Sequence, residues 1–341
     1  MKESILVAGG AGYIGSHTAV ELVEAGFDVV IVDNLSNSTA EAVEGVRKIT
    51  GVDVPFYQVD CCDAAALEKV FEKHNFNSAI HFAASKAVGE SVQKPLEYYS
   101  NNLMSLMNLI ALMRKFGREN ILFSSSCTVY GEPDAQPVTE QTPRKPALSP
   151  YGNTKAMSED ILRDSVAVYP NMRGIALRYF NPIGAHPSAL IGELPQGVPQ
   201  NLLPYITQTA AGLRECLSVF GDDYATPDGS CIRDYIDVVD LAKAHVVAVK
   251  RMTEGKSKSD YEIFNIGTGN GVSVLELIGR FQAINNLEIK YKIVPRREGD
   301  ITAIWADPTL ANNELGWQAT RTLEETLAAA WAWEKRVRNI E

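Results

Sequence analysis

The chain has 341 residues, of which 45% are hydrophobic and 22% are charged. This composition is typical of a soluble globular protein, and it excludes disordered, collagen-like and membrane-spanning classes. At ~150 residues per domain, the length predicts about two domains. Forty-two acidic residues against 32 basic ones give a net charge of −10, which argues against a general nucleic-acid-binding protein.

The five cysteines form no Cys-x-x-Cys pair and have no histidines at zinc spacing. We therefore expect no metal site and no disulfide bond. No stretch approaches the ~20 apolar residues of a membrane span. Because residues 1–3 lead directly into a strand-like segment, we also expect no signal peptide, and hence a cytoplasmic protein that contacts neither membrane nor nucleic acid.

Short apolar runs alternate with amphipathic segments through the first half of the chain. The predicted strands are residues 5–8, 29–32, 55–59, 79–82, 121–125 and 174–177, and the predicted helices between them include residues 16–25, 64–74 and 102–116. This alternation predicts βαβ units with right-handed crossovers, and therefore an α/β fold with a parallel sheet.

After residue 180 the pattern changes. Residues 181–187 and 192–199 are rich in proline and glycine, and such long loops are often binding loops. We expect a first domain at 1–180 and a smaller second domain at 181–341. A predicted helix at 238–250 and a predicted strand at 263–266 are candidates to return to the first domain.

A glycine-rich loop separates the first predicted strand from the first predicted helix. Gly9, Gly12 and Gly15 are spaced for a tight turn, for close approach of the backbone to a pyrophosphate, and for close helix–strand packing. Asp33 ends the second strand, 21 residues after Gly12, where an acid can bind ribose hydroxyls. No arginine follows within residues 34–36, so NAD is favoured over NADP. The alternative is a glycine-rich turn with an unrelated surface aspartate.

A tyrosine and a lysine four residues apart are the candidate reactive groups. Ser149 as N-cap and a proline after it predict a helix start, so Tyr151 and Lys155 share one helix face. A nearby cation favours the phenolate of a tyrosine, so this pair can transfer a proton. Ser126, at the end of the fifth strand, can hydrogen-bond a substrate oxygen. A chance Tyr-x-x-x-Lys match is the alternative, but the glycine loop and Asp33 argue against it.

Longer motifs carry a resemblance to a known family. They lie at residues 82–91, 124–131, 149–152, 178–182, 233–236 and 296–300. Over nearly its whole length the chain resembles the UDP-glucose 4-epimerase family of the extended short-chain dehydrogenase/reductase superfamily. The resemblance implies a Rossmann-type, doubly wound parallel sheet with a smaller C-terminal α/β domain for a UDP-sugar.

The resemblance also implies a reaction, the interconversion of UDP-galactose and UDP-glucose. Tyr151 would remove the proton of the sugar 4-hydroxyl, assisted by Ser126, while bound NAD+ takes hydride from C4. Lys155 would lower the tyrosine pKa and bind the nicotinamide ribose. The 4-keto sugar would turn about its phosphate linkage and take the hydride back on its other face, so the reaction is redox-neutral.

Carried over position by position, the resemblance implies two sets of contacts. Expected NAD contacts are Gly9, Gly12, Tyr13, Ile14, Gly15, Asp33, Asn34, Leu35, Ser36, Asn37, Ser38, Asp60, Cys61, Phe82, Ala83, Ala84, Ser85, Lys86, Asn101, Ser126, Tyr151, Lys155 and Phe180. Expected UDP-sugar contacts are Ser126, Tyr151, Asn181, Asn201, Leu217, Ser218, Val219, Arg233, Arg297, Asp300 and Ile304. Two arginines can neutralise a diphosphate, and Asp300 can accept from ribose hydroxyls.

Two other functions stay open at this point. A dehydratase or decarboxylase of the same superfamily is one, but dehydratases carry an Asp-Glu pair where this chain has Cys127 and Thr128, neither an effective general acid. A cofactor-binding regulatory or scaffold protein is the other, although it would be expected to lose the tyrosine or the lysine.

Substrate breadth and assembly are further expectations from the resemblance. Ile304 replaces the tyrosine or small residue usual in the family, so we expect main activity on the unacetylated pair, with weak action on UDP-GlcNAc and UDP-GalNAc left open. Helix 102–116 is amphipathic where family members dimerise, so a homodimer is expected, although its apolar stripe could equally be intramolecular core.

Overall fold

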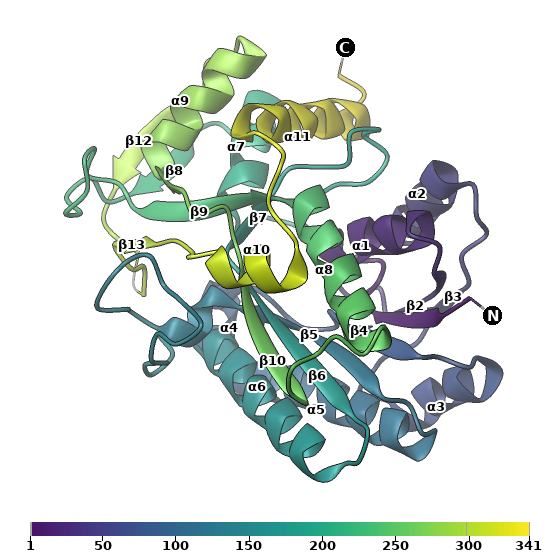
Figure 1. The fold of residues 1–341 in the computed structure, drawn as a ribbon. Coiled ribbons are helices and arrows are strands. Elements are labelled where there is room, and N and C mark those ends of the chain that lie inside the picture. The colour runs from purple at the N-terminus through teal and green to yellow at the C-terminus, as the bar shows by residue number, and fades with distance from the viewer. Residues whose placement is uncertain (1, 298, 341) are drawn as a thin grey trace.

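A seven-stranded parallel sheet with helices on both faces forms the larger part of the molecule (Figure 1). The computed structural model describes residues 2–297 and 299–340. In spatial order the strands are β10 (Tyr261–Ile266), β6 (Arg173–Tyr179), β5 (Asn120–Ser126), β4 (Ser78–His81), β1 (Ser4–Ala8), β2 (Asp28–Asp33) and β3 (Phe56–Gln58). From β1 the strand order runs outward to β2 and β3 on one side and to β4, β5 and β6 on the other. This topological switch point between β1 and β4 is where open α/β sheets bind ligands. The expected Rossmann-type sheet is confirmed.

The helices of this part form two layers. On one face lie α1 (Tyr13–Glu24), α2 (Ala40–Thr50) and α8 (Val238–Thr253). On the other lie α3 (Ala64–Lys73), α5 (Pro95–Lys115) and α6 (Pro150–Val168), with the short α4 (Val88–Gln93) in contact with α5 and α6. Both α8 and β10 belong to this part although they follow residue 180 in the chain.

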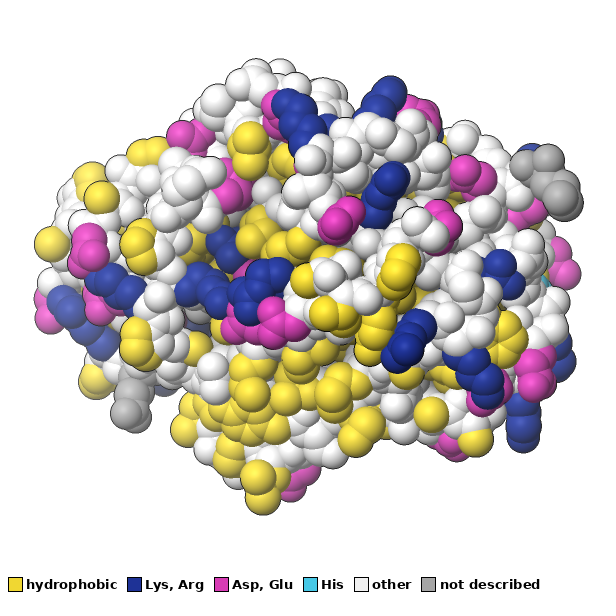
Figure 2. Space-filling model, turned by 60° about the horizontal axis from the view of Figure 1, so that its bottom comes forward, with side chains coloured by type: hydrophobic (Ala, Val, Ile, Leu, Met, Phe, Trp, Pro, Cys, Tyr) yellow, Lys and Arg dark blue, Asp and Glu magenta, His cyan; other side chains and the backbone are white. Residues whose placement is uncertain are grey.

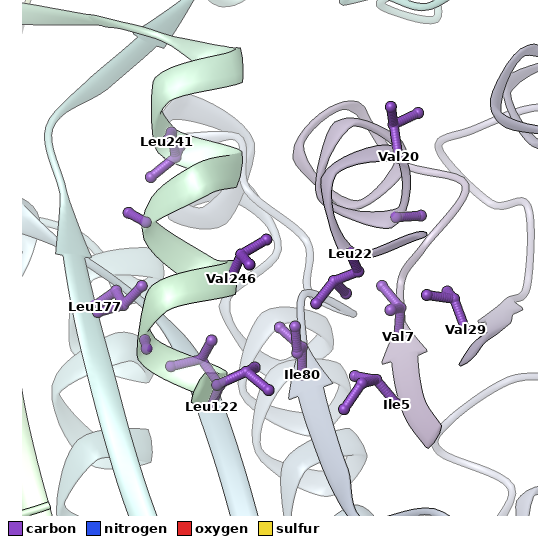
Figure 3. Close-up of a cluster of buried hydrophobic side chains, with 14 of the residues drawn as sticks. Ile5, Val7, Val20, Leu22, Val29, Ile80, Leu122, Leu177, Leu241 and Val246 are labelled. Carbon is purple, nitrogen blue, oxygen red and sulfur yellow. The ribbon is translucent and has the colours of Figure 1, made fainter. Parts of the chain in front are cut away.

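Each strand sends alternate side chains into the two helix layers. Ile5 and Val7 of β1 join the core beneath α1 and α8, whereas Leu6 and Ala8 join the core beneath α3 and α5. Figure 3 shows the first of these cores, in which side chains of α1 and α8 face those of the central strands. A fully buried aliphatic side chain of this kind contributes about 1.5–3 kcal/mol, so this two-sided core fixes the position of the strand ends that carry the site.

The remaining elements form a smaller part at the carboxyl ends of the central strands (Figure 1). Its strands are β7 (Asn181–Ile183), β8 (Leu217–Phe220), β9 (Ile232–Asp237), β11 (Gly271–Ser273), β12 (Tyr291–Val294) and β13 (Ala303–Ile304). Its helices are α7 (Leu202–Ala210), α9 (Val274–Asn285) and α11 (Leu323–Arg338), whereas α10 (Thr309–Leu315) packs against α8 and β10 of the larger part. Strand β9 pairs with β7, β11 and β13, and β8 pairs with β12.

Each of the six strands predicted in the first half of the chain is present, as are the predicted helix at 238–250 and strand at 263–266. The predicted helix at 102–116 begins earlier, at Pro95, because proline suits the first turn of a helix. Helices α2 and α4 were not predicted. No helix in the described part of the chain is long and apolar enough to cross a membrane.

Candidate active site

The glycine-rich loop joins β1 to α1 and passes very close to its neighbours. A Cβ on Gly9 would lie 2.7 Å from the amide nitrogen of Ala83, and one on Gly15 would lie 2.3 Å from the Gly9 carbonyl oxygen. Gly9 also has a positive φ of 81°. Gly12 is the N-cap of α1 and no side chain caps this helix. The start of α1 is therefore open to an anionic group, as a dinucleotide-binding loop requires.

Asp33, at the end of β2, joins this loop to the next one. Its carboxylate accepts hydrogen bonds from the backbone amides of Ala11 (3.0 Å) and Leu35 (2.9 Å) and from the Ser38 hydroxyl (2.8 Å). Residues 34–38 thus curl around the carboxylate beside the glycine loop. Asp33 therefore holds the glycine-rich loop and residues 34–38 together at the expected ribose site. This structural role is separate from the ribose contact expected from the sequence.

The other expected cofactor residues follow the carboxyl ends of the neighbouring strands or face them. Asp60 and Cys61 come after β3, Phe82 to Lys86 come after β4, and Asn101 lies on α5. Asp60 accepts from the Asn34 side chain (3.1 Å) and from the Cys62 amide (2.8 Å). The Cys61 side chain is buried in the core, so any contact it makes with a ligand is through its backbone.

Asn102 of α5 holds the segment after β4 in place. Its side chain accepts from the Ser85 amide (2.8 Å) and donates to the Ser85 carbonyl (3.0 Å) and to the Thr154 hydroxyl (3.0 Å). It thereby connects the loop at 82–86 with α6, the helix of the reactive tyrosine. The expectations from sequence did not include this residue.

Tyr151 and Lys155 lie on the first turns of α6, as predicted. Ser149 caps the helix by accepting from the Gly152 amide (3.1 Å), and Pro150 is its first residue. The Lys155 ammonium lies 5.9 Å from the centroid of the Tyr151 ring. Ser126, the last residue of β5, is close enough to the phenol to lower its pKa. The structure therefore brings the three predicted reactive residues together.

The electrostatics of this trio differ from the expectation. Burial raises the pKa of Tyr151 to about 12, against the opposing influence of Ser126. Burial also lowers the pKa of Lys155 to about 7, although Glu159, one turn further along α6, favours its charged form. The ammonium donates to the carbonyl (2.6 Å) and hydroxyl (3.2 Å) of Ser124 rather than to the phenol. A deprotonated Tyr151 therefore requires additional positive charge in the site.

The expected diphosphate-binding residues converge across the site. Arg297 donates twice to Asp300, at 3.1 and 2.7 Å, and Arg233 of β9 lies 3.7 Å from the same carboxylate. Ile304 of β13 pairs in register with Arg233 and is buried with Phe180 and Cys127. Since Cys127 follows Ser126, Ile304 is positioned at the reactive end of the site.

Other expected substrate residues are distributed along the smaller part. Asn181 begins β7, Asn201 is the N-cap of α7, and Leu217 to Val219 lie in β8. The side chains of Leu217 and Val219 are buried in the hydrophobic core, so only their backbone groups can contact a ligand. Residues 217–219 can therefore contact a ligand through the backbone of β8, and the Ser218 side chain between them is half-buried.

Two buried acids that support the site were also missed. Glu159 accepts from Arg178 (2.8 and 2.6 Å) and from the Ser125 hydroxyl (2.5 Å), and so anchors the end of β5. Asp234 accepts from backbone amides at Thr268, Gly269 and Ala306, and so fixes β9 and β13. In sequence each is a single acid in a helix or strand. Among residues 2–297 and 299–340, no group of three or more His, Cys, Asp or Glu side chains could hold a metal ion.

The fold and the site define a class of protein. A glycine loop at the switch point of a parallel sheet, beside a Tyr–Lys pair and a strand-end serine, is the arrangement of a short-chain dehydrogenase/reductase.

Comparison with known proteins narrows this class. The family model described as GDP-mannose 4,6 dehydratase matches residues 6–330. The UDP-glucose 4-epimerase of Haemophilus influenzae is 52% identical over 332 residues, covering 97% of this chain and 97% of that protein. That of Bacillus subtilis is 51% identical over 331 residues, covering 97% and 96%. The crystal structure of the Bifidobacterium longum UDP-glucose 4-epimerase in complex with NAD+ and UDP has a TM-score of 0.95 at 47% identity, covering 99% of this chain and 100% of that one. Within the extended short-chain dehydrogenase/reductase superfamily, the chain belongs to the UDP-glucose 4-epimerase family.

Proposed function

We propose that this protein is an NAD-dependent isomerase that interconverts UDP-galactose and UDP-glucose through a 4-keto intermediate. The observation that carries the proposal is the position of Tyr151. It lies beside Ser126 at the end of β5. Ile304, which is buried with Cys127, pairs in register with Arg233, and Arg233 and Arg297 both face Asp300. The relatives named above carry this activity in their names, and the B. longum structure holds NAD+ and UDP.

The residues present fit a dinucleotide. The close approach of backbone at Gly9 and Gly15 leaves no room for a side chain, and the start of α1 has no side-chain cap to compete with a pyrophosphate. Asp33 holds the adjoining loops and offers an acid for the ribose. When bound, NAD+ supplies an acceptor and donor of hydride at C4 of the sugar.

Tyr151 is the group that we assign to move the proton of the sugar 4-hydroxyl. Its pKa of about 12 keeps the phenol protonated near neutral pH, so the positive charge of Lys155 and of a bound cofactor is needed to favour the phenolate. Ser126 supports this step by donating to the oxygen that gives up its proton. The phenol then returns the proton after the hydride has been delivered to the other face.

Arg233 and Arg297 are assigned to the diphosphate, and Asp300 to the uridine ribose. In the structure the two arginines face the one carboxylate, which keeps their donor groups directed into the site. A diphosphate offers both arginines stronger, paired acceptors. Because Arg233 pairs in register with Ile304, the diphosphate position sets the distance of the sugar from Tyr151.

A dehydratase is disfavoured by the residues that follow Ser126. Burial raises the pKa of the Cys127 thiol to about 12, so this group stays protonated and apolar in character. The Thr128 hydroxyl donates to Ser126 (3.0 Å) instead of facing a leaving group. A cofactor-binding scaffold is disfavoured because the Tyr–Lys pair and Ser126 are assembled in one place.

Substrate breadth is assigned to Ile304. Its side chain is 3% exposed and packs with Phe180, so it limits the space beside the sugar. We propose main activity on the unacetylated pair, with weaker action on UDP-GlcNAc and UDP-GalNAc. Equal catalytic efficiency on both pairs would refute this assignment.

We also propose a homodimer formed by α4, α5 and α6. These helices expose Val92, Leu96, Met104, Met107 and Met157. Figure 2, in which the lower side of Figure 1 is turned forward, shows hydrophobic side chains gathered in a broad patch. Contiguous exposed apolar surface of this kind marks a protein interface. Light scattering on wild type and a Leu96→Glu variant tests it, with a shift to monomer expected in the variant.

Replacement of Tyr151 by phenylalanine tests the reaction. We expect turnover of UDP-galactose to fall by about 100-fold or more, with bound NAD retained, because only the acid/base hydroxyl is removed. Tyr57→Phe is the matched control, since Tyr57 hydrogen-bonds His74 at the end of α3 and neither residue is assigned to the site. Unchanged turnover in Tyr151→Phe would remove this residue from the mechanism.

We also propose a cytoplasmic location for the protein, as expected from the sequence, and cell fractionation would check it.

A further inference from the structure

Glu193 lies in the loop between β7 and α7 and connects two side chains from different parts of the molecule. Its Oε1 accepts a hydrogen bond from the Lys86 ammonium at 2.8 Å and another from the Asn201 side-chain amide at 2.6 Å. The Glu193 side chain is only 8% exposed, whereas that of Lys86 is 46% exposed. Both partners share a single oxygen, so a change in one bond affects the other.

The backbone at Glu193 is held in place by α11 and by a neighbouring segment of chain. The Glu193 carbonyl accepts from the indole of Trp333 on α11 at 3.0 Å. Gly192 packs so closely on that indole that a Cβ would lie 2.5 Å from the ring, and it forms a β-bridge with Ala185. The carboxylate is therefore a fixed point, and its two exposed partners are the groups free to move.

The two partners come from the two sides of the site. Lys86 follows β4 of the large sheet and lies 5.8 Å from the centroid of the Tyr13 ring, next to the glycine loop. Asn201 is the N-cap of α7 in the smaller part. A buried carboxylate close to sites for two anionic ligands is unfavourable unless it is paired, so its presence there calls for a role.

We propose that Glu193 is a positioning residue that couples the two ligand sites by holding Lys86 and Asn201 on one carboxylate oxygen. A cofactor that draws Lys86 away changes how firmly Asn201 is held, and a UDP-sugar that engages Asn201 changes the hold on Lys86. This inference rests on the proposed function, since it takes Lys86 as a cofactor contact and Asn201 as a UDP-sugar contact.

A double-mutant cycle on UDP binding tests the coupling. The dissociation constant of UDP is measured by calorimetry for wild type, Lys86→Met, Glu193→Gln and the double variant, alongside turnover of UDP-galactose. The loss of the lysine charge acts through solvent equally in both backgrounds, so it cancels in the cycle. We expect Lys86→Met to weaken UDP binding about fivefold more in wild type than in the Glu193→Gln background. Equal effects in the two backgrounds overturn the proposal.

Two further variants separate coupling from stability. Trp333→Phe removes the donor to the Glu193 carbonyl but leaves the carboxylate, so the effect of Lys86→Met on UDP binding should persist; its disappearance would show a general loosening of the loop and overturn the proposal. Asn201→Ala changes only an exposed side chain, so it does not depend on the folding of a Glu193 variant. We expect it to weaken NAD binding by about threefold, and an unchanged NAD dissociation constant counts against the coupling.

Failure of the proposed function is distinguishable from failure of the coupling. If wild type neither binds UDP nor converts UDP-galactose, the function itself is wrong and the role of Glu193 falls with it. If wild type binds and converts but the cycle is additive, only the role of Glu193 is refuted.

Discussion

Replacement of Lys155 by methionine should stabilise the protein while removing its activity. The pKa of Lys155 falls from 10.5 to about 7 because burial disfavours the ammonium more than Glu159 favours it. At about 1.4 kcal/mol for each pH unit, holding this charge costs about 5 kcal/mol. Methionine keeps the apolar stem but leaves the Ser124 carbonyl without its donor, at a cost of about 1–3 kcal/mol. The expected net gain below pH 7 is therefore about 2–4 kcal/mol in the free energy of unfolding.

The sign of the pH dependence gives this prediction its sharpest form. Below pH 7 the folded and unfolded chains both carry the Lys155 charge, so the cost is present in full. Between pH 7 and 10.5 the unfolded chain binds a proton that the folded chain has lost, so the stability of wild type rises with pH. From about pH 6 to about pH 9 the advantage of Lys155→Met should shrink by about 3 kcal/mol.

Urea unfolding of cofactor-stripped protein at these two pH values measures the effect. Lys243→Met, an exposed lysine on α8, is the matched control and should change stability by no more than about 0.5 kcal/mol at either pH. A Lys155→Met variant that is less stable than wild type at low pH would refute the reasoning. So would an advantage that does not change with pH.

Three other predictions concern the glycine-rich loop, Ile304 and two buried histidines. Gly15→Ala should abolish retention of NAD, measured by absorbance of the released cofactor, because its Cβ would lie 2.3 Å from the Gly9 carbonyl oxygen; full retention would contradict the close approach. Ile304→Ala should raise the efficiency on UDP-GlcNAc relative to UDP-glucose, at a stability cost of about 2–5 kcal/mol, and an unchanged ratio would remove this residue from specificity. Burial lowers the pKa of both His17 and His81 to about 3, so the unfolded chain alone binds their protons between pH 6.5 and about 3. As the pH is lowered through this range, the free energy of unfolding should fall by about 1.4 kcal/mol per pH unit for each histidine. Replacement His81→Asn should reduce that slope.

The large sheet was predictable because its strands are buried on both faces. A run such as residues 5–8 is apolar at every position, since each alternate side chain enters a different helix layer. The start of α6 was predictable for a local reason, because Ser149 and Pro150 act on the helix that they begin. Helix α2 was missed because its buried residues are few and its surface is mostly polar.

The support of the site was not predictable, because its partners are distant in the chain. Asn102 reaches Ser85 and Thr154, and Glu193 reaches Lys86, 107 residues before it. No local pattern distinguishes Asn102 or Glu193 from an ordinary surface polar residue. The pKa of Tyr151 was missed for a related reason, since its rise follows from burial, which the spacing of two residues on a helix does not report.

The most direct test of the central claim is incubation of the purified protein with UDP-galactose and no added NAD, with chromatographic separation of UDP-glucose. The proposed function predicts conversion to an equilibrium mixture by cofactor carried with the protein, because the reaction returns NAD+ unchanged. Absence of UDP-glucose, both without and with added NAD, would contradict the account.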